Sequence, residues 1–188
     1  MAAMLMGAWS LQSCDNEPTK EVWLDEFGQD SCYVQDWGML EVNRSVVHTP
    51  LTVNGVVYER GLGAHSISRL LYDLDGKAVS ISGLAGADDK NLFAGKLQFK
   101  ILGDKKELWK SGVMQKGDPV KEFNVNLKGV DKVLLLVEEC GDGIMYDHAD
   151  WLNVKITTRG DVKPVPAWAK PVAKEKYILT PPAPVSYT

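Results

Sequence analysis

The sequence lacks the features that mark several large classes of protein. Its 188 residues hold 21 Lys and Arg against 25 Asp and Glu, so it has no basic excess of the kind that nucleic-acid-binding proteins carry. A hydrophobic content of 45% excludes a disordered polar chain. The apolar run at its N-terminus is too short to cross a bilayer about 30 Å thick. These absences favour one folded domain around a single well-buried core.

Common catalytic patterns are missing as well. The sequence has no Gly-x-Ser-x-Gly elbow, and no HExxH or CxxC spacing supports a zinc site built from His65 and His148. Cys32 and Cys140 have no histidine near them in sequence, and in an oxidising exterior they could form a bridge or remain two separate buried thiols. A glycosidase needs two carboxylates across the scissile bond, but acidic residues in turns more often bind their own backbone or a calcium ion. We therefore expect no catalytic residues.

The N-terminus has the character of an export signal. Residues 1–11 are apolar and uncharged, and Leu11-Gln12-Ser13-Cys14 then gives way to the polar Asp15-Asn16-Glu17-Pro18. This resembles the end of a bacterial lipoprotein signal, although no basic segment precedes it. We expect residues 1–14 to be a lipoprotein-type signal segment, with Cys14 lipidated and the mature protein exported to the periplasm or cell surface. A frayed apolar terminus is the alternative.

The middle of the chain reads as short strands separated by turns. Asn54-Gly55, between two β-branched runs, is the clearest hairpin turn, and Asp75-Gly76 is a second turn. Residues 132–137 read as a central strand covered on both faces. Alternating apolar residues mark further half-buried strands, at Leu97, Phe99, Ile101, Phe123, Val125, Leu127, Leu152, Val154 and Ile156. The pattern predicts an all-β fold, an antiparallel β-sandwich of jelly-roll type.

The composition changes after Thr158. Six of the nine prolines follow this residue, at Pro164, Pro166, Pro171, Pro181, Pro182 and Pro184. Such a segment stays extended and semi-rigid. We expect residues 20–158 to form the sandwich module and residues 159–188 to be a proline-rich linker toward a missing catalytic domain.

Aromatic and polar residues in the predicted loops could form a sugar site. A sugar presents an apolar C–H face and a rim of hydroxyls, so its site pairs an exposed ring with hydrogen-bonding side chains. Trp37 beside Glu41 is one such pairing, and Trp151 beside His148 and Asp150 is another. Core packing is the commoner fate of a tryptophan.

Strand parity separates the residues of the second pairing. If residues 147–156 are extended and Leu152 faces the core, Trp151 faces away from it, while His148 and Asp150 lie on the core side. His148 and Asp150 then either contact a ligand or hold a loop by buried hydrogen bonds.

These clusters together resemble a known family, the NPCBM domains, also called carbohydrate-binding module family 51. The resemblance spans residues 23–156, and the Asp-His-Ala-Asp-Trp run is its most specific part. The motifs that carry it are Asp36-Trp37-Gly38, Arg44-Ser45, Pro50-Leu51, Tyr58-Glu59-Arg60-Gly61-Leu62-Gly63-Ala64-His65-Ser66, Asp88-Asp89, Gly103-Asp104, Leu108-Trp109-Lys110-Ser111-Gly112, Gly141-Asp142-Gly143 and Asp147-His148-Ala149-Asp150-Trp151. Asp36 and Asn43 depart from the usual glycine and aspartate of the family.

The resemblance implies a calcium-containing β-sandwich that binds galactose or galactose-terminated glycans. Such modules are appended to glycoside hydrolases, including family 27 α-galactosidases, and target them to substrate. Trp37 would stack on the sugar, while Glu41 and His65 would bind its hydroxyls. The remaining candidates are His148, Asp150 and Trp151 for sugar contact and Asp88, Asp89 and Asp142 for calcium. The rival interpretation is the N-terminal fragment of an α-galactosidase in which the module only braces the enzyme.

Overall fold

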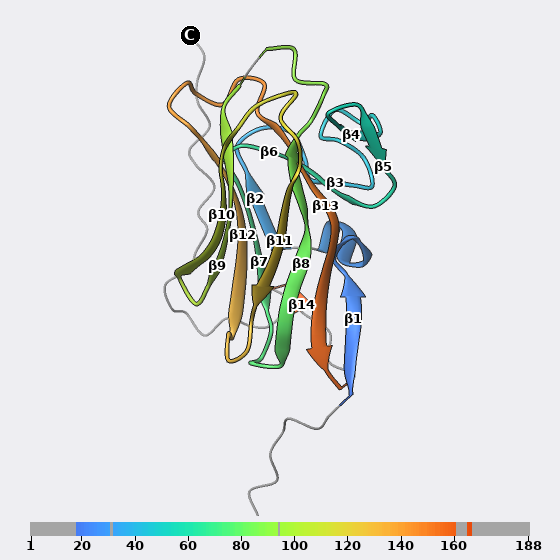
Figure 1. The fold of residues 1–188 in the computed structure, drawn as a ribbon, viewed down its shortest axis with the longest axis vertical. Coiled ribbons are helices and arrows are strands. Elements are labelled where there is room, and N and C mark those ends of the chain that lie inside the picture. Colours follow the sequence, from blue (N-terminus) through green and yellow to red (C-terminus); the bar gives the residue numbers. More distant parts are fainter. Residues whose placement is uncertain (1–17, 31, 94, 161–164, 167–188) are drawn as a thin grey trace, which may run out of the picture.

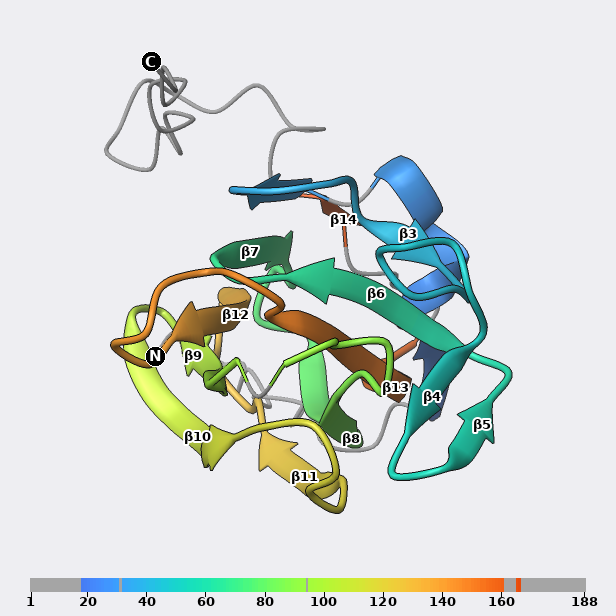
Figure 2. The same cartoon turned by 90° about the horizontal axis from the view of Figure 1, so that it is seen from above.

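The computed structural model describes residues 18–30, 32–93, 95–160 and 165–166. These residues form short strands, paired antiparallel throughout, and a single turn-rich 3-10 helix, η2 (Leu24–Asp30). Figure 1 shows them stacked as two layers, and the view in Figure 2 looks along the space between those layers. The prediction of an antiparallel β-sandwich is confirmed.

The first sheet has the strand order β11-β8-β13-β6-β3, and β1 also pairs with β13. Its strands are β1 (Thr19–Trp23), β3 (Glu41–Val42), β6 (Gly61–His65), β8 (Ala78–Ala87), β11 (Lys121–Asn126) and β13 (His148–Arg159).

The second sheet has the order β10-β9-β12-β7-β14, and β2 also pairs with β7. Its strands are β2 (Cys32–Gln35), β7 (Ser68–Asp73), β9 (Leu97–Gly103), β10 (Lys106–Met114), β12 (Lys132–Glu139) and β14 (Val165–Pro166). The predicted turn at Asp75-Gly76 therefore connects the two sheets, because β7 and β8 belong to different sheets.

The predicted Asn-Gly hairpin is present as β4 (Leu51–Val53) and β5 (Val56–Tyr58). Asn54 and Gly55 have φ values of 48° and 77°, the positive φ that this two-residue turn requires. The hairpin lies beside the first sheet, on the side away from the second (Figure 2). Leu51 and Val53 are buried there against Leu152.

Trp151 corrects the parity argument made from the sequence. The pairing of β13 with β8 shifts register between Leu152 and Lys155, and Asn153 in that interval has a φ of 49°. The extra residue of such a bulge reverses which side chains face inward. Trp151 therefore points into the core, where it is fully buried, and Leu152 points to the hairpin side.

The core between the sheets is built around aromatic rings. Trp151 meets Phe99 and Phe123 edge-on, with ring centroids 4.9 Å and 5.7 Å away. The alternation predicted for β9 is confirmed, since Leu97, Phe99 and Ile101 are all fully buried. The inward residues of β12 are also buried, but Leu134 on its outer face is only half-buried. The prediction that this strand is covered on both faces is therefore wrong at Leu134.

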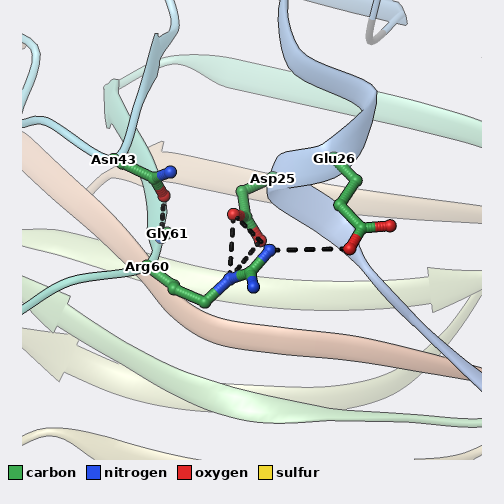
Figure 3. Close-up of polar contacts among 5 residues, drawn as sticks. All are labelled: Asp25, Glu26, Asn43, Arg60 and Gly61. Carbon is green, nitrogen blue, oxygen red and sulfur yellow. Dashed lines mark hydrogen bonds and ion pairs between the residues drawn. The ribbon is translucent and has the colours of Figure 1, made fainter.

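A polar cluster fixes the helix η2 and the loop before β4 to strand β6 (Figure 3). Arg60 donates from Nη2 to Asp25 Oδ2 at 2.8 Å and from Nε to the same oxygen at 3.0 Å. Asn43 Oδ1 accepts the backbone N–H of Gly61 at 2.9 Å. The Asn43 side chain thus holds the backbone at the start of β6.

The second sheet includes two residues that lie beyond the predicted end of the module at residue 158. Val165 and Pro166, within the predicted linker, form β14 beside Asp73 and Tyr72 of β7. The predicted signal segment with Cys14, and residues 167–188, lie outside the described residues.

Cys140 is a free, half-buried thiol. Across the described part of the chain, no helix is both long and apolar enough to span a membrane.

Candidate functional site

An open cleft of about 510 Å³ lies where loops from both sheets meet. The loops that follow β8 and precede β13 lie at the upper end of the sandwich in Figure 1. The cleft is lined by Trp37, Val47, His65, Lys90, Leu92, Ile144, Met145, Tyr146 and His148. A concave, largely apolar site with a few polar groups on a rigid scaffold is the usual form of a ligand site.

Trp37 is presented to the cleft by the backbone around it. The side chain of Gln35 donates to the carbonyl of Trp37 at 2.8 Å and accepts the backbone N–H of His65 at 3.1 Å. Gly38 follows with a φ of 69°, and a Cβ there would lie 2.9 Å from a methyl of Val46. This turn leaves 48% of Trp37 exposed.

Three rings meet on the cleft wall. The Trp37 ring lies 4.9 Å from that of His65, at an interplanar angle of 50°. It is nearly parallel to the His148 ring, at 5.8 Å and 7°. The structure thus brings together Trp37, His65 and His148, which the sequence analysis selected from three separate motifs.

The two histidines are neutral at physiological pH. Burial lowers the pKa of His65. Burial also lowers the pKa of His148, and the nearby His65 lowers it further because two protonated rings would repel each other. His65 Nδ1 lies 2.6 Å from the carbonyl oxygen of Ser66, and a carbonyl can only accept, so Nδ1 carries the proton and Nε2 is left as an acceptor. His148 Nδ1 is buried with no hydrogen-bond partner among the described residues.

Asn91 and Asp147 hold in place the backbone at His148 and the side chain of Ser66, the residue that follows His65. The side-chain amide of Asn91 accepts from the backbone N–H of His148 at 2.8 Å and donates to its carbonyl at 3.0 Å. Asp147 accepts the hydroxyl of Ser66 at 2.5 Å. Asp147 is fully buried. Burial raises the pKa of its carboxyl to about 6, although the Ser66 hydrogen bond acts in the opposite direction.

Glu41 and Trp151 do not line the cleft. The carboxylate of Glu41 pairs with Nδ1 of His48 at 3.1 Å. Trp151 is buried between the sheets, so the expectation that it faces away from the core is wrong.

The predicted calcium ligands have other partners in the structure. Both oxygens of Asp89 accept backbone N–H groups of the Asn54-Gly55 turn, at 3.0 and 2.7 Å. Asp142 accepts the backbone N–H of Lys96 at 3.2 Å. No three His, Cys, Asp or Glu side chains within the described ranges come together in a way that could hold a metal ion.

Asp88 and Asp150 instead form a buried acidic pair beneath the hairpin. Both side chains are fully buried. Asp88 accepts the backbone N–H of Lys90 at 2.6 Å and that of Thr52 at 3.3 Å. Among the described residues, the oxygens of Asp150 have no hydrogen-bond partner apart from the carboxyl of Asp88. Burial, reinforced by the charge of Asp88, raises the pKa of Asp150 well above its usual range.

Several cleft residues were missed by the sequence analysis. They are the apolar Val47, Leu92, Ile144 and Met145 and the flanking Lys90 and Tyr146. Leu92 and Met145 are 72% and 73% exposed. The sequence signal that could have identified the apolar ones is a large apolar side chain within a turn-rich segment, at a position that the alternation of a strand does not account for.

Comparison with known proteins agrees with this architecture. Alpha-1,3-galactosidase B of Akkermansia muciniphila is 29% identical over 130 residues, which cover 67% of this chain but only 16% of that protein. CBM51 from Clostridium perfringens GH95, solved in complex with methyl-galactose, superposes with a TM-score of 0.66 at 25% identity, covering 73% of this chain and 99% of that one.

A second solved structure contains the M60 catalytic domain with the CBM51-1 and CBM51-2 domains of Clostridium perfringens ZmpB. It matches with a TM-score of 0.67 at 28% identity, over 75% of this chain and 15% of that one. The fold and the open aromatic cleft thus define a carbohydrate-binding module. The sequence profile of the NPCBM/NEW2 domain matches residues 20–157. The chain belongs to this family.

Proposed function

We propose that the cleft binds galactose or galactose-terminated glycans. The observation that carries the proposal is the half-exposed Trp37 ring beside two neutral imidazoles, those of His65 and His148. The neighbour from Clostridium perfringens GH95 was solved with methyl-galactose, and the curated relative is named a galactosidase. Both support galactose as the sugar.

The chemistry of the cleft suits an uncharged sugar. The C–H face of a pyranose can stack on Trp37, and Nε2 of His65 can accept a sugar hydroxyl. Lys90 adds a donor at the wall. A volume of about 510 Å³ leaves room beyond a single ring for the next unit of a glycan.

The same cleft gives no support to hydrolysis by the module itself. None of the described residues that line it is Asp or Glu, whereas glycoside hydrolysis uses two carboxylates across the scissile bond. We propose that the module is non-catalytic and that it concentrates substrate near an attached glycoside hydrolase domain through its linker.

Calorimetric titration of the 188-residue chain with methyl α-galactoside and methyl β-galactoside tests the proposal, with methyl glucosides as the matched control. We expect saturable binding of a galactoside and weaker binding of the glucosides, with no release of reducing sugar from an α-galactoside. Absence of binding to any glycan on an array would instead favour the role of a structural brace.

Export with a lipid at Cys14 is also a proposal, supported by the uncharged apolar residues 1–11 and the Leu-Gln-Ser-Cys run that follows. Metabolic labelling with a fatty-acid analogue in a bacterial host should mark the protein and should not mark Cys14→Ser. Equal labelling of both would contradict the proposal.

Calcium is proposed only for the buried acidic pair. In the described structure the oxygens of Asp150 have no hydrogen-bond partner apart from the carboxyl of Asp88, and carboxylate oxygens are the ligands that calcium prefers. Asp88 and Asp150 would hold the ion, and backbone carbonyls would have to complete its coordination.

A further inference from the structure

The outer face of the second sheet carries a row of three leucines. Leu134 of β12 lies directly opposite Leu71 of β7 on one side and Leu102 of β9 on the other. All three side chains are half-buried, whereas their inward neighbours on the same strands belong to the buried core. The row therefore crosses three adjacent strands at right angles to their direction.

Charged residues bound this row. Asp104, Lys105, Asp131 and Lys132 line one end of a groove of about 340 Å³ that also includes the three leucines. Asp104 is fixed in this position, because its carboxylate accepts the backbone N–H groups of Asp131 and Lys132 at 3.0 and 2.9 Å. At the other end, Leu136 lies between Arg69 and Lys100. The groove is thus an apolar strip between charged margins, the form of a surface that is covered by another segment.

Strand β14 ends beside this groove. Val165 pairs with Asp73 and Pro166 with Tyr72, so the next position along the edge of β7 is Leu71. That position is already occupied, because Cys32 of β2 pairs with Leu71. The edge position next to Pro166 is therefore not open to a further residue of β14. The inner side of the sheet at this point is filled by the core, and the groove lies on the outer side.

The sequence after Pro166 has the composition to cover leucines. Residues 167–172 read Ala-Trp-Ala-Lys-Pro-Val and hold a single charge. Strands are about 4.8 Å apart and an extended chain advances about 3.3 Å per residue, so three or four residues suffice to cross the row.

We propose that residues 167–172 dock in this groove and that Trp168 is their main contact with Leu71, Leu134 and Leu102. The sandwich would thereby hold the first part of its own C-terminal segment. Docking would fix the point from which the chain continues, on a face of the sandwich distinct from the sugar cleft. This inference does not depend on which glycan the cleft binds.

Amide hydrogen exchange of the 188-residue chain tests the proposal, with residues 174–179 of the same segment as the internal reference. We expect the amides of residues 168–170 to exchange at least roughly tenfold more slowly than those reference amides, because a docked backbone is shielded from exchange. Trp168→Ala and Leu134→Ser should each abolish the difference. Val113→Ser, on the 60% exposed Val113 of the same sheet, should leave it intact.

Exchange of residues 168–170 at the reference rate in the unaltered protein would overturn the proposal. So would slow exchange that survives both Trp168→Ala and Leu134→Ser. Slow exchange could also appear only at high protein concentration, together with a dimer in sedimentation that Leu134→Ser dissociates. That result would assign the groove to a second copy of the chain and would also overturn the proposal.

Discussion

The ring of Trp37 lies nearly parallel to the ring of His148, with centroids 5.8 Å apart. The two residues are 111 positions apart in sequence (148 − 37): Trp37 follows β2, and His148 is the first residue of β13. His148 is buried and Trp37 is half-exposed. The imidazole therefore supports the indole, and the exposed part of Trp37 is available to a ligand.

Replacing Trp37 should impair binding more than folding. A stacking contact on an aromatic ring is worth about 1 to 3 kcal/mol, so Trp37→Ala should weaken galactoside binding roughly ten- to hundredfold. The thermal midpoint should change little, because 48% of the side chain is already exposed. Calorimetric titration and thermal unfolding of the same purified variant measure both effects. A large fall in the midpoint would show that Trp37 is a core residue.

Trp151 provides the matched contrast. Its side chain is fully buried and meets Phe99 and Phe123 edge-on. Truncation of a buried tryptophan to alanine costs about 3 to 5 kcal/mol. Trp151→Ala should therefore lower the free energy of unfolding by this amount in a denaturant titration. A variant that is as stable as the unaltered protein would contradict the position of Trp151 in the core.

The different outcomes at Trp37 and Trp151 show what the sequence could predict. Alternation located the strands because each has one buried face, as at Leu97 and Phe99 of β9. Alternation failed in β13 because the bulge at Asn153 reverses the parity, and neither hydrophobicity nor a glycine marks that bulge. The meeting of His65 with Trp37 depends on the pairing of distant strands and on the Gln35 side chain, which local patterns do not encode.

Asp147 should make stability depend on pH. Burial raises the pKa of its carboxyl from 3.8 to about 6, so the folded protein binds this proton more tightly than the unfolded chain does. The free energy of unfolding should therefore fall as pH rises from about 4 through about 6, by at most about 3 kcal/mol from this residue.

Asp147→Asn isolates that contribution. An amide cannot ionise, yet its oxygen can still accept the Ser66 hydroxyl. The difference in unfolding free energy between the variant and the unaltered protein should favour the variant increasingly as pH rises through this window. Denaturant titrations at several pH values measure that difference. A difference that is constant with pH would mean that Asp147 titrates alike in the folded and unfolded states.

Protonation of the cleft histidines should oppose sugar binding. Burial holds the pKa of His65 and His148 below the ordinary value of 6.5, so both rings stay neutral down to lower pH than a free histidine. Once His65 is protonated, Nε2 becomes a donor and can no longer accept a sugar hydroxyl. Galactoside affinity should be constant above pH 6.5 and decline only below it. A decline centred above that value would contradict the neutral state assigned to the rings.

Experiments on the acidic pair of Asp88 and Asp150 can distinguish a calcium ion bound between the two side chains from a proton shared by them. If calcium binds there, it stabilises only the folded state, by about 2.7 kcal/mol at a hundredfold excess over its dissociation constant. Chelator should then lower the thermal midpoint, added calcium should restore it, and Asp150→Asn should abolish the response. Asp142→Asn is the matched control: it removes a charge from an acidic loop residue that contacts Lys96, and it should leave the calcium response intact.

If instead the raised pKa of Asp150 keeps its carboxyl protonated, neither chelator nor calcium should move the midpoint. Asp150→Asn should then preserve stability, because the amide replaces a neutral acid of nearly the same shape. It should raise stability where the pH is high enough to ionise Asp150 in the unaltered protein, since burying that charge is costly. Differential scanning fluorimetry of both variants, with and without calcium and across pH, separates these outcomes. Absence of any calcium response would leave Asp88 and Asp150 as a proton-sharing support for the hairpin above them and would remove calcium from this module.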